Sequence, residues 1–343
     1  MAYTNIDDPS AYFQIATWSG NSSTQTITND GNSDLQPDWI WIKQRSSTQW
    51  HTVTDTSRGL TKYQFTNSNG TESTVANIVT ASNTDGFSLG SDQRGNASSQ
   101  TYVGWQWKAN GGTTASNADG DITSTVQVNS DAGFSIIQYT GSGTTNDTIG
   151  HGLGVTPNWV IFKRRDVGNG NWDIQIDGTS RATLNLTEAA ATNVLSSFSS
   201  TTVGLSTGGD AQKNVSGSKY TAYAFAEKQG YSRFSSYVGN GNANGAFVYT
   251  GFKPAFVMVK RSDGTSDWTI LDNKREGYNL INKRLVANSD AAEATYNVLD
   301  FVSNGFKFRD GDGIWNGSGS NYIYMAFAEN PFTTSTGIPA TAR

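Results

Sequence analysis

Short apolar runs, each preceded by a proline and followed by lysine or arginine, recur three times along the chain. The runs cover residues 39–42, 159–162 and 256–259. The preceding prolines are Pro37, Pro157 and Pro254. Uninterrupted apolar runs of this length are typical of strands that are buried on both faces. The pattern therefore predicts three central β-strands in equivalent positions of three repeats.

Each repeat closes on a segment rich in aromatic residues, at 102–107, 220–227 and 322–329. In the second of these, Tyr223 and Phe225 alternate with alanines, which predicts a strand with one face in a core and the other close to a neighbour. Turn residues recur every 8–12 positions or so, as in all-β folds. Two alanine-containing segments, 186–198 and 288–302, are compatible with short helices as well as with strands.

A second set of residues repeats in a fixed order after each proline: a tryptophan, an aspartate and an arginine. With the prolines, this signature comprises Pro37, Trp50, Asp55, Arg58, Pro157, Trp172, Asp177, Arg181, Pro254, Trp268, Asp272 and Arg275. One hypothesis makes the aspartates ligands or catalytic acids and the arginines clamps for an anion. The other makes each pair a structural ion pair that braces a turn. We favour the structural hypothesis, because a scaffold requirement recurs in every repeat whereas a catalytic site seldom does.

The repeats divide the chain into modules of about 100 residues, the size of a small β-sandwich. We predict an all-β fold of three tandem β-sandwich modules, of jelly-roll or lectin-like type, at residues 1–108, 131–228 and 231–330. Residues 109–130 are predicted to be a linker that is flexible or pairs as a strand, and residues 331–343 an extended tail. Because only two residues separate the last two modules, we expect those two to be fixed to each other and the first to be more loosely placed.

Charge and composition narrow the function. The 343 residues include 24 Lys and Arg, 29 Asp and Glu, 10 Trp, 14 Tyr and 16 Phe, with no Cys. The aromatic content indicates a folded protein, and a net charge of −5 argues against nucleic-acid binding. The apolar runs are too short for membrane insertion, and thiolate metal sites and disulfides are excluded. The first residues lack a secretory signal pattern, so we expect synthesis in a cytoplasm.

Candidate chemistry outside the repeats is sparse. Two segments that resemble calcium loops, 117–121 and 310–316, lack the full ligand pattern and are expected to be surface turns. His51 and His151 have no counterpart of the same type in the other repeats, and each repeat offers one recurring aspartate rather than a glycosidase pair. We therefore predict no enzymatic activity, no cofactor and no metal. Exposed aromatic rings among amides are typical of sugar-binding faces. The rings left open between core and surface are Trp105, Trp107, Trp315 and Tyr324.

The stretch from Asn117 to Gly143, with the following 149–154 and Pro157, resembles a module that recurs in structural and tail-fibre-like proteins of marine bacteriophages of the cyanophage and pelagiphage type. The resemblance continues through Trp172 and the segment 220–227, and returns at 322–343. It covers the second and third modules well and the first through Pro37 and Trp50. It implies a virion component built of lectin-like β-sandwich modules, and it supplies no ligand-binding residues.

These observations together predict a bacteriophage virion structural protein of the tail or fibre apparatus with a role in host attachment. It is expected to be located in the virion after release by lysis. Expected partners are other virion proteins, copies of the same chain and a host surface glycan. A capsid decoration or collar protein is the alternative within the virion, and a free carbohydrate-binding lectin is the alternative of another class.

Overall fold

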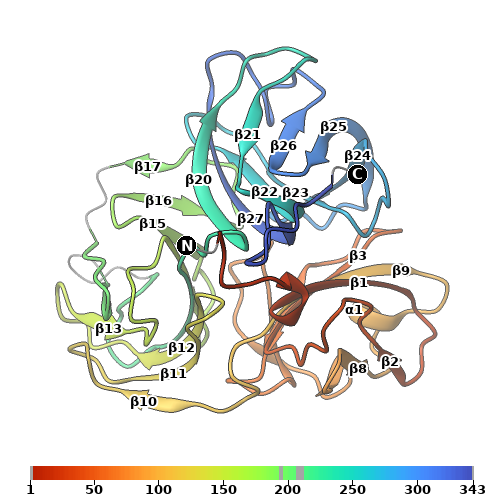
Figure 1. Cartoon of the computed structure of the whole chain (residues 1–343). Helices are drawn as coiled ribbons and strands as arrows, with labels where there is room; N and C mark the ends of the chain where they lie inside the picture. The colour runs from red at the N-terminus through yellow and green to blue at the C-terminus, as the bar shows by residue number, and fades with distance from the viewer. Residues whose placement is uncertain (1–2, 193–195, 206–211, 342–343) are drawn as a thin grey trace.

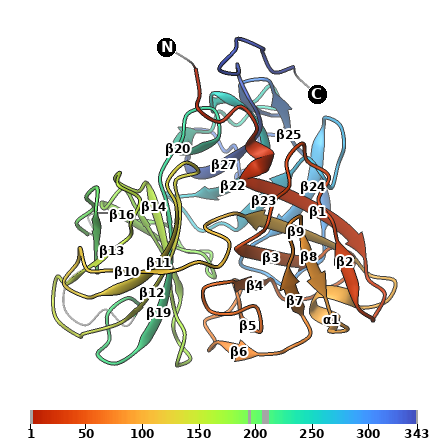
Figure 2. The same ribbon diagram turned by 60° about the horizontal axis from the view of Figure 1, so that its bottom comes forward.

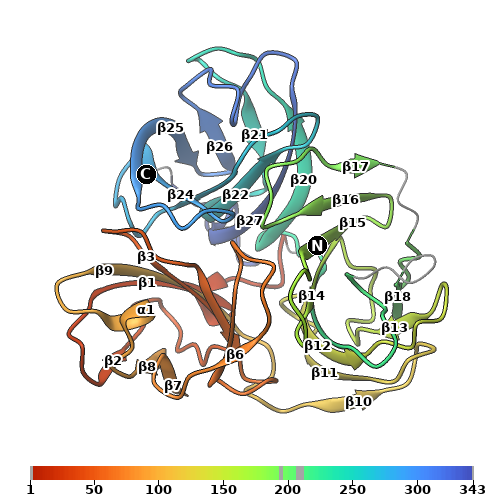
Figure 3. The same cartoon turned by 180° about the vertical axis from the view of Figure 1, so that it is seen from behind.

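The computed structural model describes residues 3–192, 196–205 and 212–341, and it is all-β. Its strands form antiparallel sheets in three lobes that surround a common centre (Figures 1 and 3). Within the described ranges the helical segments are the short 3₁₀ turn η1 (Pro9–Ala11) and the single-turn α1 (Gln93–Asn96). No helix in these ranges is long and apolar enough to cross a membrane.

Unit 1 packs a six-stranded sheet against a three-stranded one. The larger sheet has the order β1-β9-β3-β4-β5-β6 and the smaller β2-β8-β7. Its strands are β1 (Phe13–Ser19), β2 (Gln25–Ile27), β3 (Trp39–Gln44), β4 (Thr52–Asp55), β5 (Lys62–Phe65), β6 (Ser73–Thr74), β7 (Val79–Ser82), β8 (Phe87–Leu89) and β9 (Thr101–Trp107).

Unit 2 has an eight-stranded sheet and a two-stranded one. The larger sheet has the order β10-β11-β12-β19-β14-β15-β16-β17 and the smaller β13-β18. Its strands are β10 (Ala115–Asn117), β11 (Ser124–Asn129), β12 (Phe134–Thr140), β13 (Thr148–Gly150), β14 (Trp159–Arg164), β15 (Trp172–Ile176), β16 (Ser180–Thr183), β17 (Ala191–Thr192), β18 (Thr202–Gly204) and β19 (Lys219–Phe225).

Unit 3 is one eight-stranded sheet of order β20-β27-β22-β23-β24-β25-β26-β21, bent so that β22 also contacts β25 and β26. Its strands are β20 (Ser232–Val238), β21 (Phe247–Tyr249), β22 (Phe252–Arg261), β23 (Trp268–Asp272), β24 (Ile281–Val286), β25 (Ala294–Val302), β26 (Gly305–Phe308) and β27 (Asn321–Pro331). In all three units a central strand pairs with the closing aromatic strand, as in Trp39 with Trp107, Trp159 with Phe225 and Phe256 with Phe327.

Each central sheet is buried on both faces, and the two faces belong to different cores. One face of each sheet closes a core inside its own unit. The other face contributes to a fourth core, which joins side chains from all three units, including Trp107, Phe225 and Phe327. The three repeats therefore form one body around a shared aromatic centre. Figure 2 shows the three lobes side by side.

Neither of the two segments that the sequence left open as short helices is helical where the structure describes it. Residues 294–302 form strand β25 rather than a helix, because Tyr296, Val298 and Phe301 favour a pleated surface and the last two are buried there. Residues 186–192 form no helix either and end in the short strand β17. Part of that predicted segment, 193–195, lies outside the described residues.

The segment predicted to be a linker, 109–130, pairs as strands. It contains β10 and β11, and β11 adds to β12 of unit 2 along five residue pairs. The N-terminal segment is also tied down: the Tyr3 hydroxyl donates to the Gly251 carbonyl at 2.7 Å, and the Thr4 hydroxyl to the Gln229 carbonyl at 2.7 Å. Both contacts hold the start of the chain against unit 3 and its connection to unit 2.

Candidate functional site

A buried lysine from each central strand reaches across the boundary to the preceding unit. Lys163 Nζ of unit 2 donates to the Gly70 carbonyl of unit 1 at 2.8 Å. Lys260 Nζ of unit 3 donates to the Thr187 carbonyl of unit 2, and Lys43 Nζ of unit 1 to the Asp290 carbonyl of unit 3, both at 3.2 Å. The three boundaries, which we call junctions 1/2, 2/3 and 3/1, are therefore built alike in cyclic order.

A ring lies beside each lysine and crosses the same boundary. Trp172 Nε1 donates to the Phe65 carbonyl at 2.7 Å, and Trp268 Nε1 to the Thr183 carbonyl at 2.9 Å. By strand register the matching position of unit 1 is His51, four residues before Asp55, and not Trp50. His51 is fully buried, whereas Trp50 is 40% exposed. The other repeats have no histidine at this position, but by register His51 is the counterpart of Trp172 and Trp268, which the comparison of residue types did not find.

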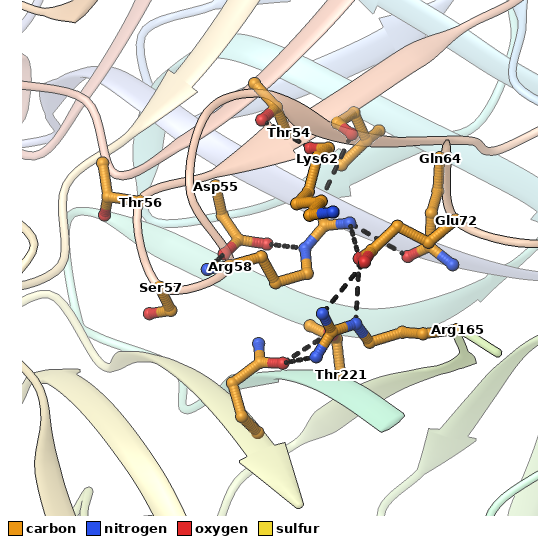
Figure 4. Close-up of polar contacts among 12 residues, drawn as sticks. Thr54, Asp55, Thr56, Ser57, Arg58, Lys62, Gln64, Glu72, Arg165 and Thr221 are labelled. Carbon is orange, nitrogen blue, oxygen red and sulfur yellow. Dashed lines mark hydrogen bonds and ion pairs between the residues drawn. The ribbon is translucent and has the colours of Figure 1, made fainter. Parts of the chain in front are cut away.

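Junction 1/2 contains a chain of four charged side chains (Figure 4). Arg58 Nε contacts Asp55 Oδ2 at 2.5 Å, and Arg58 Nη1 contacts Glu72 Oε2 at 3.0 Å. Arg165 of unit 2 binds both oxygens of Glu72, at 2.8 and 3.0 Å. Burial would raise the pKa of Glu72, but Arg165 and Arg58 together hold that pKa below its usual value. The Tyr223 hydroxyl donates to Asp55 at 2.8 Å and completes the network.

Junction 3/1 repeats this network with the same residue types. Arg275 Nε contacts Asp272 Oδ2 at 2.6 Å, and Arg275 Nη1 contacts Glu293 Oε2 at 3.1 Å. Arg45 of unit 1 binds both oxygens of Glu293 at 2.9 Å. Trp105 Nε1 donates to Asp272 at 3.0 Å, in the place of the Tyr223 hydroxyl. Two of the three predicted Asp–Arg pairs are thus buried ion pairs, and each is also part of a junction.

Junction 2/3 has the same backbone hydrogen bond as the other two junctions but lacks their charged side chains. The Ala190 N–H donates to the Ser262 carbonyl at 2.9 Å. The equivalent backbone bonds run from the Glu72 N–H to the Arg165 carbonyl and from the Glu293 N–H to the Arg45 carbonyl. Register places Ile176 opposite Trp159, in the position of Asp55 and Asp272. Three residues on, Thr179 stands where the other units have Arg58 and Arg275.

The predicted pair of Asp177 and Arg181 does not form. Asp177 lies one position beyond the register of the other two aspartates, in the left-handed region with φ of +47°. Arg181 instead contacts Asp173 at 3.5 Å and is 35% exposed. Partial burial raises the pKa of Asp177, against a weaker opposing effect of the Asn158 side chain.

The space left by the missing arginines and glutamate is a cavity of about 570 Å³. Its apolar side includes Trp159, Phe234 and Ile323, and its polar side carries serine and threonine hydroxyls, Asn321 and two carboxylates. The lining residues are Trp159, Ile176, Asp177, Thr179, Ser180, Ala189, Ala190, Thr192, Phe234, Ser235, Ser236, Ser262, Asp263, Asn321 and Ile323. We take this cavity as the candidate functional site. Unit 1, which was expected to be more loosely placed than the others, is ion-paired to both of its neighbours, whereas units 2 and 3 are joined without such pairs.

A further repeated element could have been found in the sequence. An asparagine stands six residues before the first tyrosine of each closing strand, at Asn96, Asn214 and Asn316. All three are buried, and each side-chain oxygen accepts a backbone N–H from the turn after the strand that pairs with the closing strand (β1, β12 or β20), at 2.8–3.0 Å. The Asn-x-Ser pattern at these sites therefore marks a structural asparagine.

The aromatic rings left undecided by the sequence are all in the cores. Trp105, Trp107, Trp315 and Tyr324 are each at most 1% exposed, so none of them can stack on a ligand from solvent. Three ring pairs repeat instead as stacks at the far end of each sheet: Trp18 with Tyr102, Tyr139 with Tyr220, and Tyr237 with Tyr322. Their role is packing.

The two calcium-like segments form turns. In one, Asp310 and Asp312 side chains accept backbone N–H groups two residues further on, at 3.1 and 2.8 Å. Asn117 does the same for Asp119 at 3.1 Å. Across the described part of the chain, no cluster of three or more His, Cys, Asp and Glu side chains has the geometry to hold a metal ion.

The fold and its junctions define an all-β protein of three pseudo-equivalent units, in which junction 2/3 lacks the charged network of the other two. The chain belongs to the family described as a domain of unknown function (DUF7483), whose model matches residues 8–331. This single match spans all three units, in agreement with their shared core. No curated protein and no solved structure matches the chain significantly.

The junction lysines make stability depend on pH. Burial lowers the pKa of Lys163 to about 7 and the pKa of Lys43 and of Lys260 to about 8, against 10.5 for an unfolded lysine. Between pH 7 and 9.5 the unfolded chain therefore binds more protons than the folded chain, so the free energy of unfolding rises with pH. We expect the urea midpoint to increase over this range.

A substitution assigns that rise to the lysines. Lys163→Met removes one of the three groups, so its urea midpoint should increase less steeply between pH 7 and 9.5 than that of the unsubstituted chain. Equal slopes for the two proteins would show that Lys163 does not contribute, and a falling midpoint in both would contradict the lowered pKa values.

Proposed function

We propose that this protein is a bacteriophage virion structural protein of the tail or fibre apparatus with a role in host attachment. The proposal is supported by the resemblance of its second and third units to modules of marine phage fibre-like proteins. The structural observation that carries it is the asymmetry of the junctions. Two of them are closed by Arg–Glu ion pairs that cross the boundary, each backed by a buried Asp–Arg pair, and the third lacks these groups and presents a cavity lined by apolar side chains, hydroxyls, one amide and two carboxylates.

This arrangement suits a rigid body that presents a binding surface. The two repeated Asp–Arg pairs that form are buried in the networks of junctions 1/2 and 3/1. Their role in this proposal is therefore structural and not catalytic. A rigid scaffold with one recognition site fits an attachment protein, because preorganised sites lose less entropy on binding. Partners of the proposed role are other virion proteins, further copies of the chain and a host surface glycan.

An enzymatic role has one observation in its favour, since the cavity holds two carboxylates, Asp177 and Asp263. Glycosidases need one carboxyl group as acid and a second that is free to act as nucleophile or base. Asp263 is already bound by Arg261 at 2.8 Å and by the Asn321 N–H at 2.8 Å. Asp177 is therefore the one carboxylate of the pair without a cationic partner in the described chain. We propose binding without hydrolysis.

Electron microscopy of labelled particles tests the virion assignment. Particles made from the genome that encodes this chain would be treated with gold-labelled antibody against the purified protein and imaged in negative stain. We expect gold at the tail or its fibres. Gold on the head or neck would identify a decoration or collar protein instead. Purified particles without gold, with the chain free in the lysate, would reject the virion assignment and favour a free lectin.

A further inference from the structure

The cavity at junction 2/3 lies where the other two junctions are filled by charged side chains. At each of those, one arginine and one glutamate from the earlier unit and one arginine from the later unit occupy the corresponding space. At junction 2/3 the equivalent positions are Thr179, Ala190 and Ser262. All three replacements are smaller and uncharged, while the backbone bond from Ala190 to Ser262 keeps the two units at the same separation.

The emptied space is not refilled by larger neighbours. Two hydrogen bonds across the boundary hold units 2 and 3 together here. Lys260 Nζ donates to the Thr187 carbonyl, and Trp268 Nε1 donates to the Thr183 carbonyl. The cavity volume of about 570 Å³ lies within the ~300–1,000 Å³ range of small-molecule sites. Three smaller, uncharged side chains therefore stand in a backbone framework that all three junctions share, and the space beside them stays open. A ligand-binding site requires such an open space.

The lining indicates the chemistry of the ligand. The apolar part of the lining that ligands can reach is Ile323, which is half-buried, with Ile176 beside it, while the Trp159 and Phe234 rings, with centroids 5.8 Å apart, are buried at 1% and 4% exposure. The lining also includes Thr179, Ser180 and Ser236, whose hydroxyls can donate and accept hydrogen bonds. A small apolar area among many neutral hydrogen-bonding groups suits a sugar ring, whose C–H face packs on apolar side chains while its hydroxyls bind polar groups.

Charge further limits the ligand. The lining includes two carboxylates and no lysine or arginine. Asp263 is compensated by Arg261, and Asp177 forms no ion pair within the described residues. An anionic sugar would face the uncompensated carboxylate of Asp177, and the nearby Arg261 is already paired with Asp263, so like-charge repulsion disfavours such a sugar.

We propose that the cavity between units 2 and 3 binds a saccharide that carries no acidic group. The proposal rests on the attachment role proposed above and names the ligand class for it. The two are tested separately, because sugar binding is measured on the purified full chain and the virion assignment is measured on particles.

The test uses an array of defined glycans built from neutral hexoses, N-acetylhexosamines, hexosamines and uronic acids, probed with the purified full chain. We expect binding to some non-acidic glycans and none to glycans that end in a uronic acid. The double variant Ala190→Glu with Ser262→Arg restores the side chains of the other two junctions and fills the cavity. It should reduce binding at least tenfold without lowering the melting temperature.

A matched control separates loss of the cavity from added charge. Thr114→Glu with Ser116→Arg introduces the same two side chains at exposed positions near β10, at the opposite edge of the unit 2 sheet, and should bind as the unsubstituted chain does. The proposal is overturned if no non-acidic glycan binds, if uronic acids bind equally well, or if the filled double variant binds unchanged. Cleavage of a bound glycan would also contradict it and would favour the enzymatic alternative.

Discussion

Replacing Arg58 by alanine is expected to lower the free energy of unfolding by about 3–5 kcal/mol, the usual cost of removing one partner from a buried ion pair. Both Arg58 and Asp55 side chains are fully buried. Without the guanidinium, Asp55 keeps only the Tyr223 hydroxyl and the backbone N–H at position 58, and Glu72 keeps only Arg165. Urea unfolding monitored by circular dichroism measures the change.

The chain supplies its own control for this prediction. Arg181 occupies the place in the sequence where the third pair was expected, yet it is 35% exposed and lies 3.5 Å from Asp173. Arg181→Ala should therefore cost less than about 1 kcal/mol, as expected for a partly exposed ion pair. If Arg58→Ala and Arg181→Ala destabilise the protein equally, the distinction drawn between sealed and open junctions is wrong.

Replacing Phe327 by alanine is expected to cost about 3–5 kcal/mol and to weaken all three units together. The Phe327 ring lies within 5.0–6.2 Å of rings from every unit, including Phe13 of unit 1 and Phe225 of unit 2. Truncation leaves a cavity at the point where the units meet, since the surrounding rings are held by their own strands and cannot collapse into it.

Native-state hydrogen exchange measures where that loss is felt. The slowest amides of β3 in unit 1 and of β14 in unit 2 should lose protection by the same amount as those of β27, which carries the substitution. As a control, Phe247→Ala at a ring that is 49% exposed should change stability by no more than about 0.5 kcal/mol. A loss of protection confined to unit 3 would show that the units unfold separately.

The sequence was sufficient for the repeats and the strands at their centre. A proline, four apolar residues and a lysine in each copy predicted β3, β14 and β22, and the alternating rings predicted β9, β19 and β27. These patterns are local, since they depend on strand periodicity and on which face each side chain takes. What covers the second face of a strand is not local, so a shared fourth core could not be derived from them.

The predicted signature was misaligned in units 1 and 2 for a specific reason. Trp50 precedes Asp55 by five residues, and Trp172 precedes Asp177 by five, so two false matches supported each other. Register shows that the true spacing is four, as from Trp268 to Asp272, with His51 and Ile176 at the positions that differ in type. Matching by residue type cannot find an equivalent position at which the residue type differs between repeats. At junction 2/3 the positions that differ in type are the ones that line the candidate site.

The junction glutamates could not be predicted by comparing the repeats either. Glu72 lies 17 residues after Asp55, whereas Glu293 lies 21 residues after Asp272, because the hairpins between them differ in length. Their partners Arg165 and Arg45 do stand in register, each two residues after a junction lysine. That lysine-x-arginine spacing, with Ser262 as its exception after Lys260, is the one sequence signal that points to the open junction.

Differential scanning calorimetry of the full chain tests most directly whether the three copies form one body around a shared core. For a single cooperative unit the van't Hoff enthalpy equals the calorimetric enthalpy. The shared core predicts one transition with a ratio close to one. Two or three resolved transitions, or a van't Hoff enthalpy near one third of the calorimetric value, would contradict it and show three independent modules on a string.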